Sequence, residues 1–292
     1  MIINTTAVLR SMCCLYTVGH VVEVVHTLPE GGPVIGVTSL DNEIFLVRRK
    51  EPDEIEVYDA ITYRLQRGLT VPNACVLIDM TSCEHFHCLY IGDSDFECVH
   101  RLDAEGNASH WPIHDKPIGL SGNAAHNVIV TCRFVRKIKE FSSHGDLLRE
   151  LTLPDDVINP WHTKQLRSGQ FIVCHDDGED NNPVHRVCVI SADGRHIVHS
   201  RGGQPGSDID QYDESFHLAI DDNECVYVAD FVNRRVTLLS PTLTYIRQVV
   251  SSDYLKWLPI RLYLDVQRRC LYVADNDLED DCPAGRVVVF SV

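Results

Sequence analysis

The pentapeptide LYVAD at residues 271–275 decides the fold, because copies of it recur along the chain. VYVAD stands at residues 226–230 and LYIGD at residues 89–93. Looser copies begin at residues 44 (IFLVR), 128 (VIVTC) and 171 (FIVCH), so the steps between the six starts are 45, 39, 43, 55 and 45 residues. A period of this length is typical of repeat architectures, in which each repeat is one supersecondary unit.

Each repeat predicts four strands. The fifth copy contains FHLAI from residue 216, VYVAD, RVTLLS from residue 235 and YIRQVV from residue 245, with polar turns between them. Short runs rich in Val, Ile and Tyr that are bounded by Asp, Asn and Gly indicate strands, and no window has a helical period. Gly106, Gly145 and Gly194 end AEG, SHG and ADG turns, where a tight hairpin needs a positive φ.

Residues 216–236 resemble the NHL repeat, whose pattern is an apolar strand, a polar turn, a V-x-V-A-D-like strand and then N-x-R-[IV]. Asn233 and Arg235 supply the last part only in this copy, residues 259–275 repeat the first part, and the other four copies are degenerate. The resemblance covers about residues 21–292 and implies an all-β, six-bladed β-propeller with four-stranded antiparallel blades, as in the TolB-like propeller superfamily. Similar propellers serve as protein-binding and RNA-binding platforms, for example in tripartite-motif ubiquitin ligases, and also as enzymes.

The sixth copy lacks its fourth strand, because the sequence ends at Val292. An unpaired edge would leave the ring open. Residues 21–28 (VVEVVHTL) precede the first copy, and we expect them to close the ring against residues 286–292. Residues 1–20 fit no repeat and are expected to be loosely held.

The chain is acidic, with 42 Asp and Glu against 26 Lys and Arg, and both halves share this excess. An acidic surface repels a phosphate backbone, which argues against general nucleic-acid binding. The N-terminus has no basic leader and Arg10 interrupts its apolar character, so neither a secretory signal nor a membrane span is expected, and the chain is predicted to be cytoplasmic. Twelve cysteines are scattered mostly singly, which indicates buried free thiols.

In such a propeller the first strand of each blade lines the central channel, so equivalent positions form rings. Counting back from the VYVAD-like strands gives one ring: Ile35, Ala74 or Cys75, Gly119, His162, His217 and Arg261. The last positions of the same strands give a second ring: Arg48, Asp93, Cys132, His175, Asp230 and Asp275.

These rings allow two interpretations. His162, His175 and His217 could hold zinc with an open position, and the carboxylates could hold calcium, as in propellers similar to peptidylglycine-amidating lyases and gluconolactonase-type hydrolases. Under this interpretation the protein would be a metal-dependent hydrolase or lyase. The favoured interpretation has no cofactor and no catalytic residue: the Asp side chains accept backbone hydrogen bonds and the His side chains fill the channel.

The function that we predict first is a protein-binding scaffold, possibly within a ubiquitin-ligase-type assembly. Two lengthened connections, CEHFHC from residue 83 and RGGQPGSDIDQYDES from residue 201, are expected to lie on one binding face. A second alternative is RNA binding through the one basic cluster, RFVRKIK at residues 133–139. Its candidate residues are Arg133, Arg136, Lys137 and Lys139.

Overall fold

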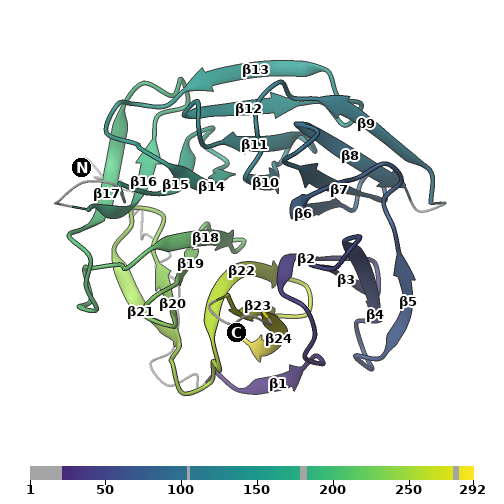
Figure 1. Cartoon of the computed structure of the whole chain (residues 1–292). Helices are drawn as coiled ribbons and strands as arrows, with labels where there is room; N and C mark the ends of the chain where they lie inside the picture. Colours follow the sequence, from purple (N-terminus) through teal and green to yellow (C-terminus); the bar gives the residue numbers. More distant parts are fainter. Residues whose placement is uncertain (1–21, 104–105, 178–182, 279–282) are drawn as a thin grey trace, which may run out of the picture.

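The computed structural model describes residues 22–103, 106–177, 183–278 and 283–292. Within these residues the secondary structure consists of β-strands alone. These strands form six four-stranded antiparallel sheets, arranged as blades around a central axis (Figure 1). The prediction of an all-β, six-bladed propeller is therefore confirmed. None of the described residues forms a helix that could cross a membrane.

Five blades are continuous in sequence. Blade 1 contains β2 (Val34–Leu40), β3 (Glu43–Arg48), β4 (Glu54–Asp59) and β5 (Leu65–Leu69). Blade 2 contains β6 (Leu77–Cys83), β7 (Cys88–Asp93), β8 (Cys98–Asp103) and β9 (Ala108–Pro112). Blade 3 contains β10 (Gly119–Gly122), β11 (Val128–Cys132), β12 (Lys137–Phe141) and β13 (Leu147–Thr152). Blade 4 contains β14 (Pro160–Gln165), β15 (Phe171–Asp176), β16 (His185–Ile190) and β17 (Ile197–Gly203). Blade 5 contains β18 (Ser215–Ile220), β19 (Val226–Asp230), β20 (Arg235–Leu239) and β21 (Tyr245–Val250).

Blade 6 combines the two ends of the chain. Its strands from the C-terminal part are β22 (Leu258–Asp265), β23 (Cys270–Asp277) and β24 (Ala284–Ser291), and its outer strand is β1 (Val24–Thr27). β1 pairs antiparallel with β24, with Val24 opposite Phe290 and Thr27 opposite Val288 (Figure 1, purple beside yellow). The Leu28 N–H also donates to the Val287 carbonyl at 2.8 Å. The predicted closure of the ring is confirmed.

The VYVAD strand is apolar on both sides because it is packed between two blades. In β19, Val226 and Val228 pack against blade 4, whereas Tyr227 and Ala229 pack against blade 6. All five residues of the strand are buried. Full burial of a Val side chain contributes roughly 1.5–3 kcal/mol, so each repeat of this motif stabilises two blade interfaces at once.

The turns have the expected chemistry. Gly106, Gly145 and Gly194 have φ of 85°, 92° and 78°. At Gly145 a Cβ would stand 2.6 Å from the Trp111 ring, so this turn requires glycine for its close packing as well as for its φ. None of the nine described cysteines is in a disulfide, and all except Cys75 are buried, as expected.

The two ends of the ring differ. Inner strands of neighbouring blades lie side by side in the same direction: Thr38 bonds Ser82, and Ser121 bonds the Thr163 carbonyl. The loop face is the end of the ring that carries the connections into each inner strand and the loops after each second strand. The turn face is the opposite end, which carries the β-turns after the first and third strands.

Two expectations about the connections are wrong. Residues 84–87 lie on the turn face and residues 204–214 lie on the loop face, because they join opposite ends of inner strands. The CEHFHC segment is also not an added loop, since Cys83 pairs with Cys88 and only four residues turn between them. With this hairpin in the correct register, Asp79 pairs with Gly92 and takes the channel position that was predicted for Ala74 or Cys75. In blade 1 the equivalent channel position belongs to Gly36, which pairs with Val47, and not to Ile35.

Candidate functional site

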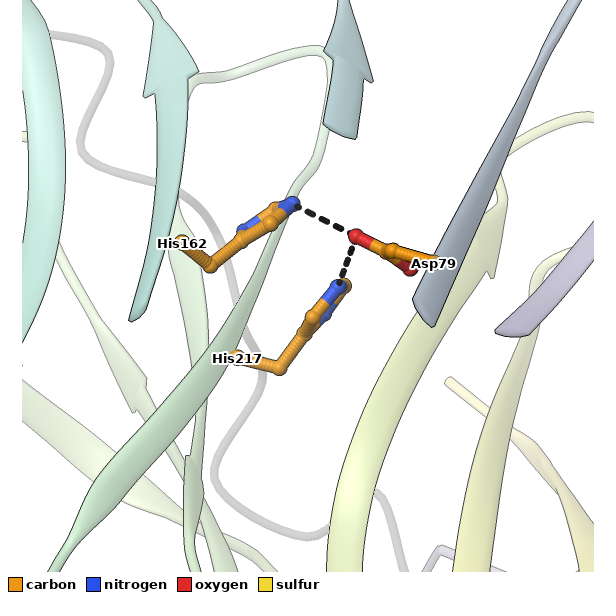
Figure 2. Close-up of side chains that lie close together, drawn as sticks. All are labelled: Asp79, His162 and His217. Atoms are coloured by element: carbon orange, nitrogen blue, oxygen red, sulfur yellow. Dashed lines mark ion pairs between the residues drawn. The ribbon is translucent and has the colours of Figure 1, made fainter. Parts of the chain in front are cut away.

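Four polar side chains converge where the inner strands meet. Asp79 comes from β6, His162 from β14, His217 from β18 and Arg261 from β22, and we call this set the channel girdle. One Asp79 oxygen, Oδ2, lies 3.6 Å from His217 Nε2 and 4.0 Å from His162 Nε2 (Figure 2). The other, Oδ1, lies 3.3 Å from Arg261 Nε. The two imidazole rings stack with centroids 3.7 Å apart.

Each girdle residue bonds the backbone of another blade. His162 Nδ1 accepts the Leu218 N–H at 3.3 Å, and His217 Nδ1 accepts the Leu262 N–H at 3.2 Å. Asp79 accepts the Leu120 N–H at 2.8 Å. Arg261 donates to the carbonyls of Ile35 and Ile78 at 3.0 and 2.7 Å. The girdle therefore joins neighbouring blades around the channel through side chain to backbone hydrogen bonds.

The same bonds fix the tautomer of both histidines. Because Nδ1 accepts a backbone N–H in each ring, the proton of the neutral imidazole is on Nε2. His162 Nε2 then donates to the Leu120 carbonyl at 3.0 Å, whereas His217 Nε2 is buried without a hydrogen-bond partner. Burial lowers the pKa of both rings well below the usual range, and neighbouring positive charge adds to this for His217 through Arg261.

This donor set does not suit a metal ion. Asp79, His162 and His217 have ligand atoms within 4.8 Å of one another. However, neither neutral imidazole keeps a free lone pair, because Nδ1 accepts a hydrogen bond and Nε2 carries the proton. Arg261 adds a positive charge beside the same carboxylate. A metal at this point would have to displace protons and break bonds between blades.

His175 does not join the other two histidines. It lies on β15, where its Nε2 is 3.3 Å from Cys188 Sγ, and burial lowers its pKa to about 4. The third member of the cluster is Asp79, which the sequence reasoning missed. The apolar run LIDMTSC at residues 77–83 was the available signal, because its Asp stands at a strand position where an apolar residue would otherwise be expected.

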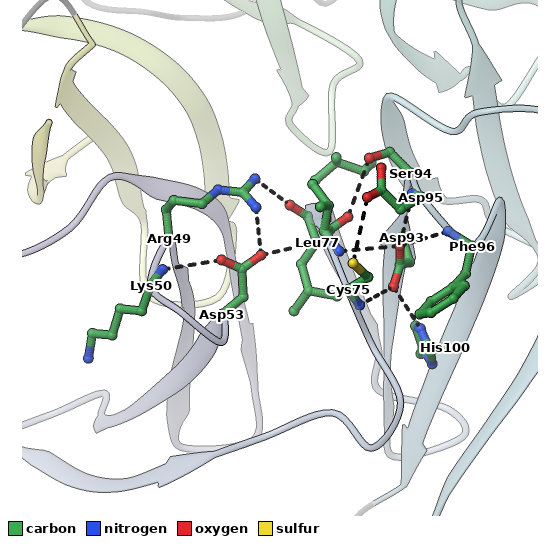
Figure 3. Close-up of polar contacts among 12 residues, drawn as sticks. Arg49, Lys50, Asp53, Cys75, Leu77, Asp93, Ser94, Asp95, Phe96 and His100 are labelled. Carbon is green, nitrogen blue, oxygen red and sulfur yellow. Dashed lines mark hydrogen bonds and ion pairs between the residues drawn. The ribbon is translucent and has the colours of Figure 1, made fainter.

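The aspartates that end the VYVAD-like strands hold the loop-face connections. Asp93 accepts the N–H groups of Cys75 and Phe96 (Figure 3). Asp230 accepts the Asp213 N–H, and Asp275 accepts those of Lys256 and Trp257. Burial raises the pKa of Asp230 to about 6, against the opposing effect of its donors. These carboxylates are occupied within their own blades.

Arg48, the equivalent residue of blade 1, is a buried clamp at the ring closure. Its guanidinium pairs with Glu56 at 2.8 Å and donates to three carbonyl oxygens, those of Pro29, Gly32 and Gly285. Burial alone would raise the pKa of Glu56, but its hydrogen bond and charge interaction with Arg48 hold it below the usual range. The clamp thus links blade 1 to blade 6 and to the segment that follows β1.

The basic cluster of blade 3 does not form a free positive patch. Arg133 stacks 3.6 Å over the Trp161 ring, Arg136 pairs with Asp155, and Lys137 pairs with Glu150 at 2.7 Å. Lys139 is buried and pairs with Asp115 at 2.6 Å. Because each of these cations already has a partner, the cluster offers little to a phosphate backbone.

A pocket of about 350 Å³ opens on the turn face below the girdle. Its wall includes Lys164, His217, Thr38, Ser82, Asn123 and Tyr263. This volume lies in the range of small-molecule sites.

The loop face carries a row of aromatic side chains. Trp161 stacks on Phe216 with centroids 4.1 Å apart, and Phe216 contacts Phe231 at 4.9 Å. We call these three residues the aromatic row. Arg133 covers the outer side of Trp161, and the indole N–H donates to Asp176. The row spans blades 4 and 5 beside the channel entrance.

Exposed apolar side chains are concentrated on this face. Of the described large hydrophobic residues that are exposed, two are in turn-face turns, Ile61 and Val266, and six are in outer strands. Seven are in loop-face connections: Phe96, Phe134, Val135, Ile209, Val232, Tyr254 and Leu278. Phe134 is 73% exposed. Among the described residues, the connections of the loop face therefore expose more large apolar side chains than the turns of the turn face do.

Comparisons with known proteins support the fold alone. No family model and no curated protein matches the sequence. A protein of unknown function from Bacteroides caccae aligns with TM-score 0.63 and 13% identity over 82% of this chain and 85% of that one. Virginiamycin B lyase from Staphylococcus aureus aligns with TM-score 0.60 and 10% identity over 93% and 99%. The Swd1 β-propeller domain from Myceliophteria thermophila aligns with TM-score 0.61 and 10% identity over 93% and 99%.

One of these neighbours is an enzyme, and another is named only as a β-propeller domain. The similarity therefore shows a shared architecture and assigns no activity to this chain. The NHL resemblance rests on the motifs of the fifth and sixth copies.

Proposed function

We propose that this protein is a recognition propeller that binds a protein partner on its loop face. The observation that carries the proposal is the aromatic row, together with the seven exposed apolar side chains in the connections of the same face. Binding energy at protein interfaces is concentrated in a few residues, and Trp, Tyr and Arg are enriched among them.

The row is held in place before any partner arrives. Trp161 is fixed by the Arg133 guanidinium on one side, by Phe216 on the other and by its hydrogen bond to Asp176. Side chains that are already ordered lose less entropy on binding. The loop face therefore supplies rigid contacts rather than flexible ones.

The negative charge of the chain indicates what kind of partner the loop face would bind. The net charge is −16, and the connection at residues 204–214 beside the row contributes Asp208, Asp213 and Glu214, whereas Asp210 in the same connection pairs with Arg201. Complementary potentials favour encounter and specificity. The partner segment that fits best combines apolar and basic side chains. The NHL resemblance makes a ubiquitin-ligase-type assembly the proposed setting, with this chain supplying recognition.

A peptide-display selection against the intact protein tests the proposal. Selected peptides should be enriched in Arg, Lys and apolar residues, and Phe134→Ala or Phe96→Ala should weaken their binding at least tenfold. Both rings are exposed, 73% and 58%, so their removal should leave the fold intact. Ile61→Ala and Val266→Ala, on the turn face, are the matched controls.

The proposal fails if the selected peptides bind both loop-face variants as tightly as the wild type, or if the turn-face variants are the ones that lose binding.

A further inference from the structure

The hairpin between β6 and β7 places two cysteines opposite each other on the turn face. Cys83 ends β6, Cys88 begins β7, and the register of the two strands pairs them directly. Directly opposite residues in an antiparallel pair have Cα atoms about 4.5 or 5.5 Å apart, and a disulfide forms at Cα separations of about 4.4–6.8 Å. The backbone of this hairpin therefore permits a bond between the two sulfur atoms.

The side chains of this pair also lie together. Opposite residues in an antiparallel pair project from the same face of the sheet, and Cys83 and Cys88 belong to one buried cluster between blades 2 and 3. No other described cysteine on a strand has a cysteine as its strand partner; this holds for Cys98, Cys132, Cys174, Cys188 and Cys270. The hairpin is thus the one place in the described strands where the pairing suits a disulfide.

The two thiols differ in access. Cys83 is 8% exposed and lines the turn-face pocket, so a small molecule in the pocket can reach it. Cys88 is fully buried. Burial, with a smaller contribution from the neighbouring Cys83, raises the pKa of the Cys88 thiol. Cys83 is therefore the thiol that meets a dissolved reagent, and Cys88 is placed to react with Cys83.

The histidines of the same turn have other partners. The sequence CEHFHC has the composition of a zinc site, but the His85 ring stacks on His126 with centroids 4.3 Å apart. His87 lies 3.5 Å from an Asp41 carboxylate oxygen. The described residues contain no cluster of three metal ligands that includes either thiol. The arrangement favours a reaction between the two sulfur atoms over shared binding of a metal ion.

We propose that Cys83 and Cys88 form a reversible disulfide when the protein meets a peroxide. Hydrogen peroxide oxidises the Cys83 thiol to a sulfenic acid and releases one water. The Cys88 sulfur then attacks the Cys83 sulfur, the S–O bond breaks, and the hydroxide leaves as a second water with the Cys88 proton. Two thiols and one peroxide thus give one disulfide and two waters, and a dithiol reductant restores both thiols.

The bond would fix the turn at residues 84–87 against blade 3. Phe86 in this turn contacts the rings of His126 and His144, with centroids 6.2 Å away in both cases. Because a disulfide restricts the unfolded chain, oxidation should raise the thermal unfolding midpoint by about 2–6 °C. The hairpin lies at the opposite end of the ring from the aromatic row, so this proposal is independent of the binding function proposed above.

A peroxide pulse on the full chain, followed by alkylation of the remaining thiols and a non-reducing digest, tests the proposal. A protease that cleaves after glutamate separates Cys83 from Cys88 at the exposed Glu84, so the disulfide should join two peptides until reductant is added. The expected loss is two alkylatable thiols per chain. Cys270 has the same 8% exposure but pairs with Asp265 and Ser291, and it should remain alkylated.

Substitutions separate the two roles. Cys83→Ser should abolish both the joined peptides and the rise of the midpoint, whereas Cys270→Ser should keep both. Cys88→Ser should leave the Cys83 sulfenic acid, which dimedone labels. The digest of the wild-type protein decides the question even if a variant fails to fold. Two alkylated thiols after the pulse, a bond from either residue to a different cysteine, or oxidation of Cys83 without a disulfide would overturn the proposal.

Discussion

His162 and His217 come from neighbouring blades and stack face to face, yet each ring is aligned by a backbone N–H of the next blade. A cluster of two histidines and one aspartate on a channel axis resembles a metal site by composition. The direction of its hydrogen bonds makes it a structural link between blades. This distinction depends on which nitrogen accepts, and it leads to the first two predictions.

The first prediction concerns pH. His162, His217 and His175 have pKa values lowered by burial, so the unfolded chain binds protons below about pH 6.5 that the folded chain does not. Stability is complete above that pH and should fall as the pH decreases from 6.5 to 5, by up to about 1.4 kcal/mol per pH unit for each histidine. Urea unfolding at several pH values measures the slope.

The control for this slope is the double variant His162→Asn and His217→Asn, which retains an acceptor near each backbone N–H. It should be less stable at neutral pH and less sensitive to pH than the wild type. His114→Asn, at an exposed site, should keep the wild-type slope. Equal slopes in all three proteins would contradict the assignment of neutral, buried rings.

The second prediction concerns metal. Because both Nε2 atoms carry protons and both Nδ1 atoms accept backbone bonds, zinc or calcium should not bind to the girdle. Chelator treatment should leave the thermal unfolding midpoint unchanged, and added zinc should not raise it. About one tightly held metal per chain, with a lower midpoint after chelation, would support the metal-dependent enzyme instead.

The third prediction concerns the ring closure. Leu28 is fully buried and continues the pairing of β1 with β24, so Leu28→Ala should lower the free energy of unfolding by about 2–5 kcal/mol. A chain that starts at residue 21 should still fold, because it retains β1. A chain that starts at residue 30 should unfold earlier or aggregate through the exposed edge of β24.

The fourth prediction concerns Arg48. Arg48→Met removes the buried partner of Glu56, which keeps Tyr58 and Lys50, and leaves the Pro29 and Gly32 carbonyl oxygens without a donor. The free energy of unfolding should therefore decrease by about 2–6 kcal/mol. Arg67→Met removes an exposed pair with Glu43 and should change it by less than about 1 kcal/mol. Chemical denaturation compares the two variants. Equal changes in the free energy of unfolding would show that the buried Arg48 clamp contributes no more to stability than an exposed ion pair.

The strands and the ring closure were predictable because their signals are local. Val226 to Ala229 alternate between two interfaces, so the motif has to be apolar throughout, and its period counts the blades. The closing strand was predicted because the sixth copy of the repeat has no fourth strand of its own. Both inferences depend on apolar pattern, which the sequence displays directly.

The site residues were less predictable, because register decides them. A shift of a few residues in counting exchanged Asp79 for Ala74 or Cys75, since the hairpin between Cys83 and Cys88 was interpreted as an insertion. Lys164 gave no signal at all. A single lysine in a strand is ordinarily a solvated residue, and only the surrounding blades reveal that it lines the turn-face pocket.

Blade 6 is assembled from segments that are far apart in the sequence. While a ribosome is still producing blades 1 to 5, β1 has no partner, because the strand beside it, β24, is made after them. Contacts between such distant segments are slow to form. The nascent chain must therefore keep β1 unpaired until β24 has been made, and any factor that shields residues 22–28 during this time should increase the yield of native protein.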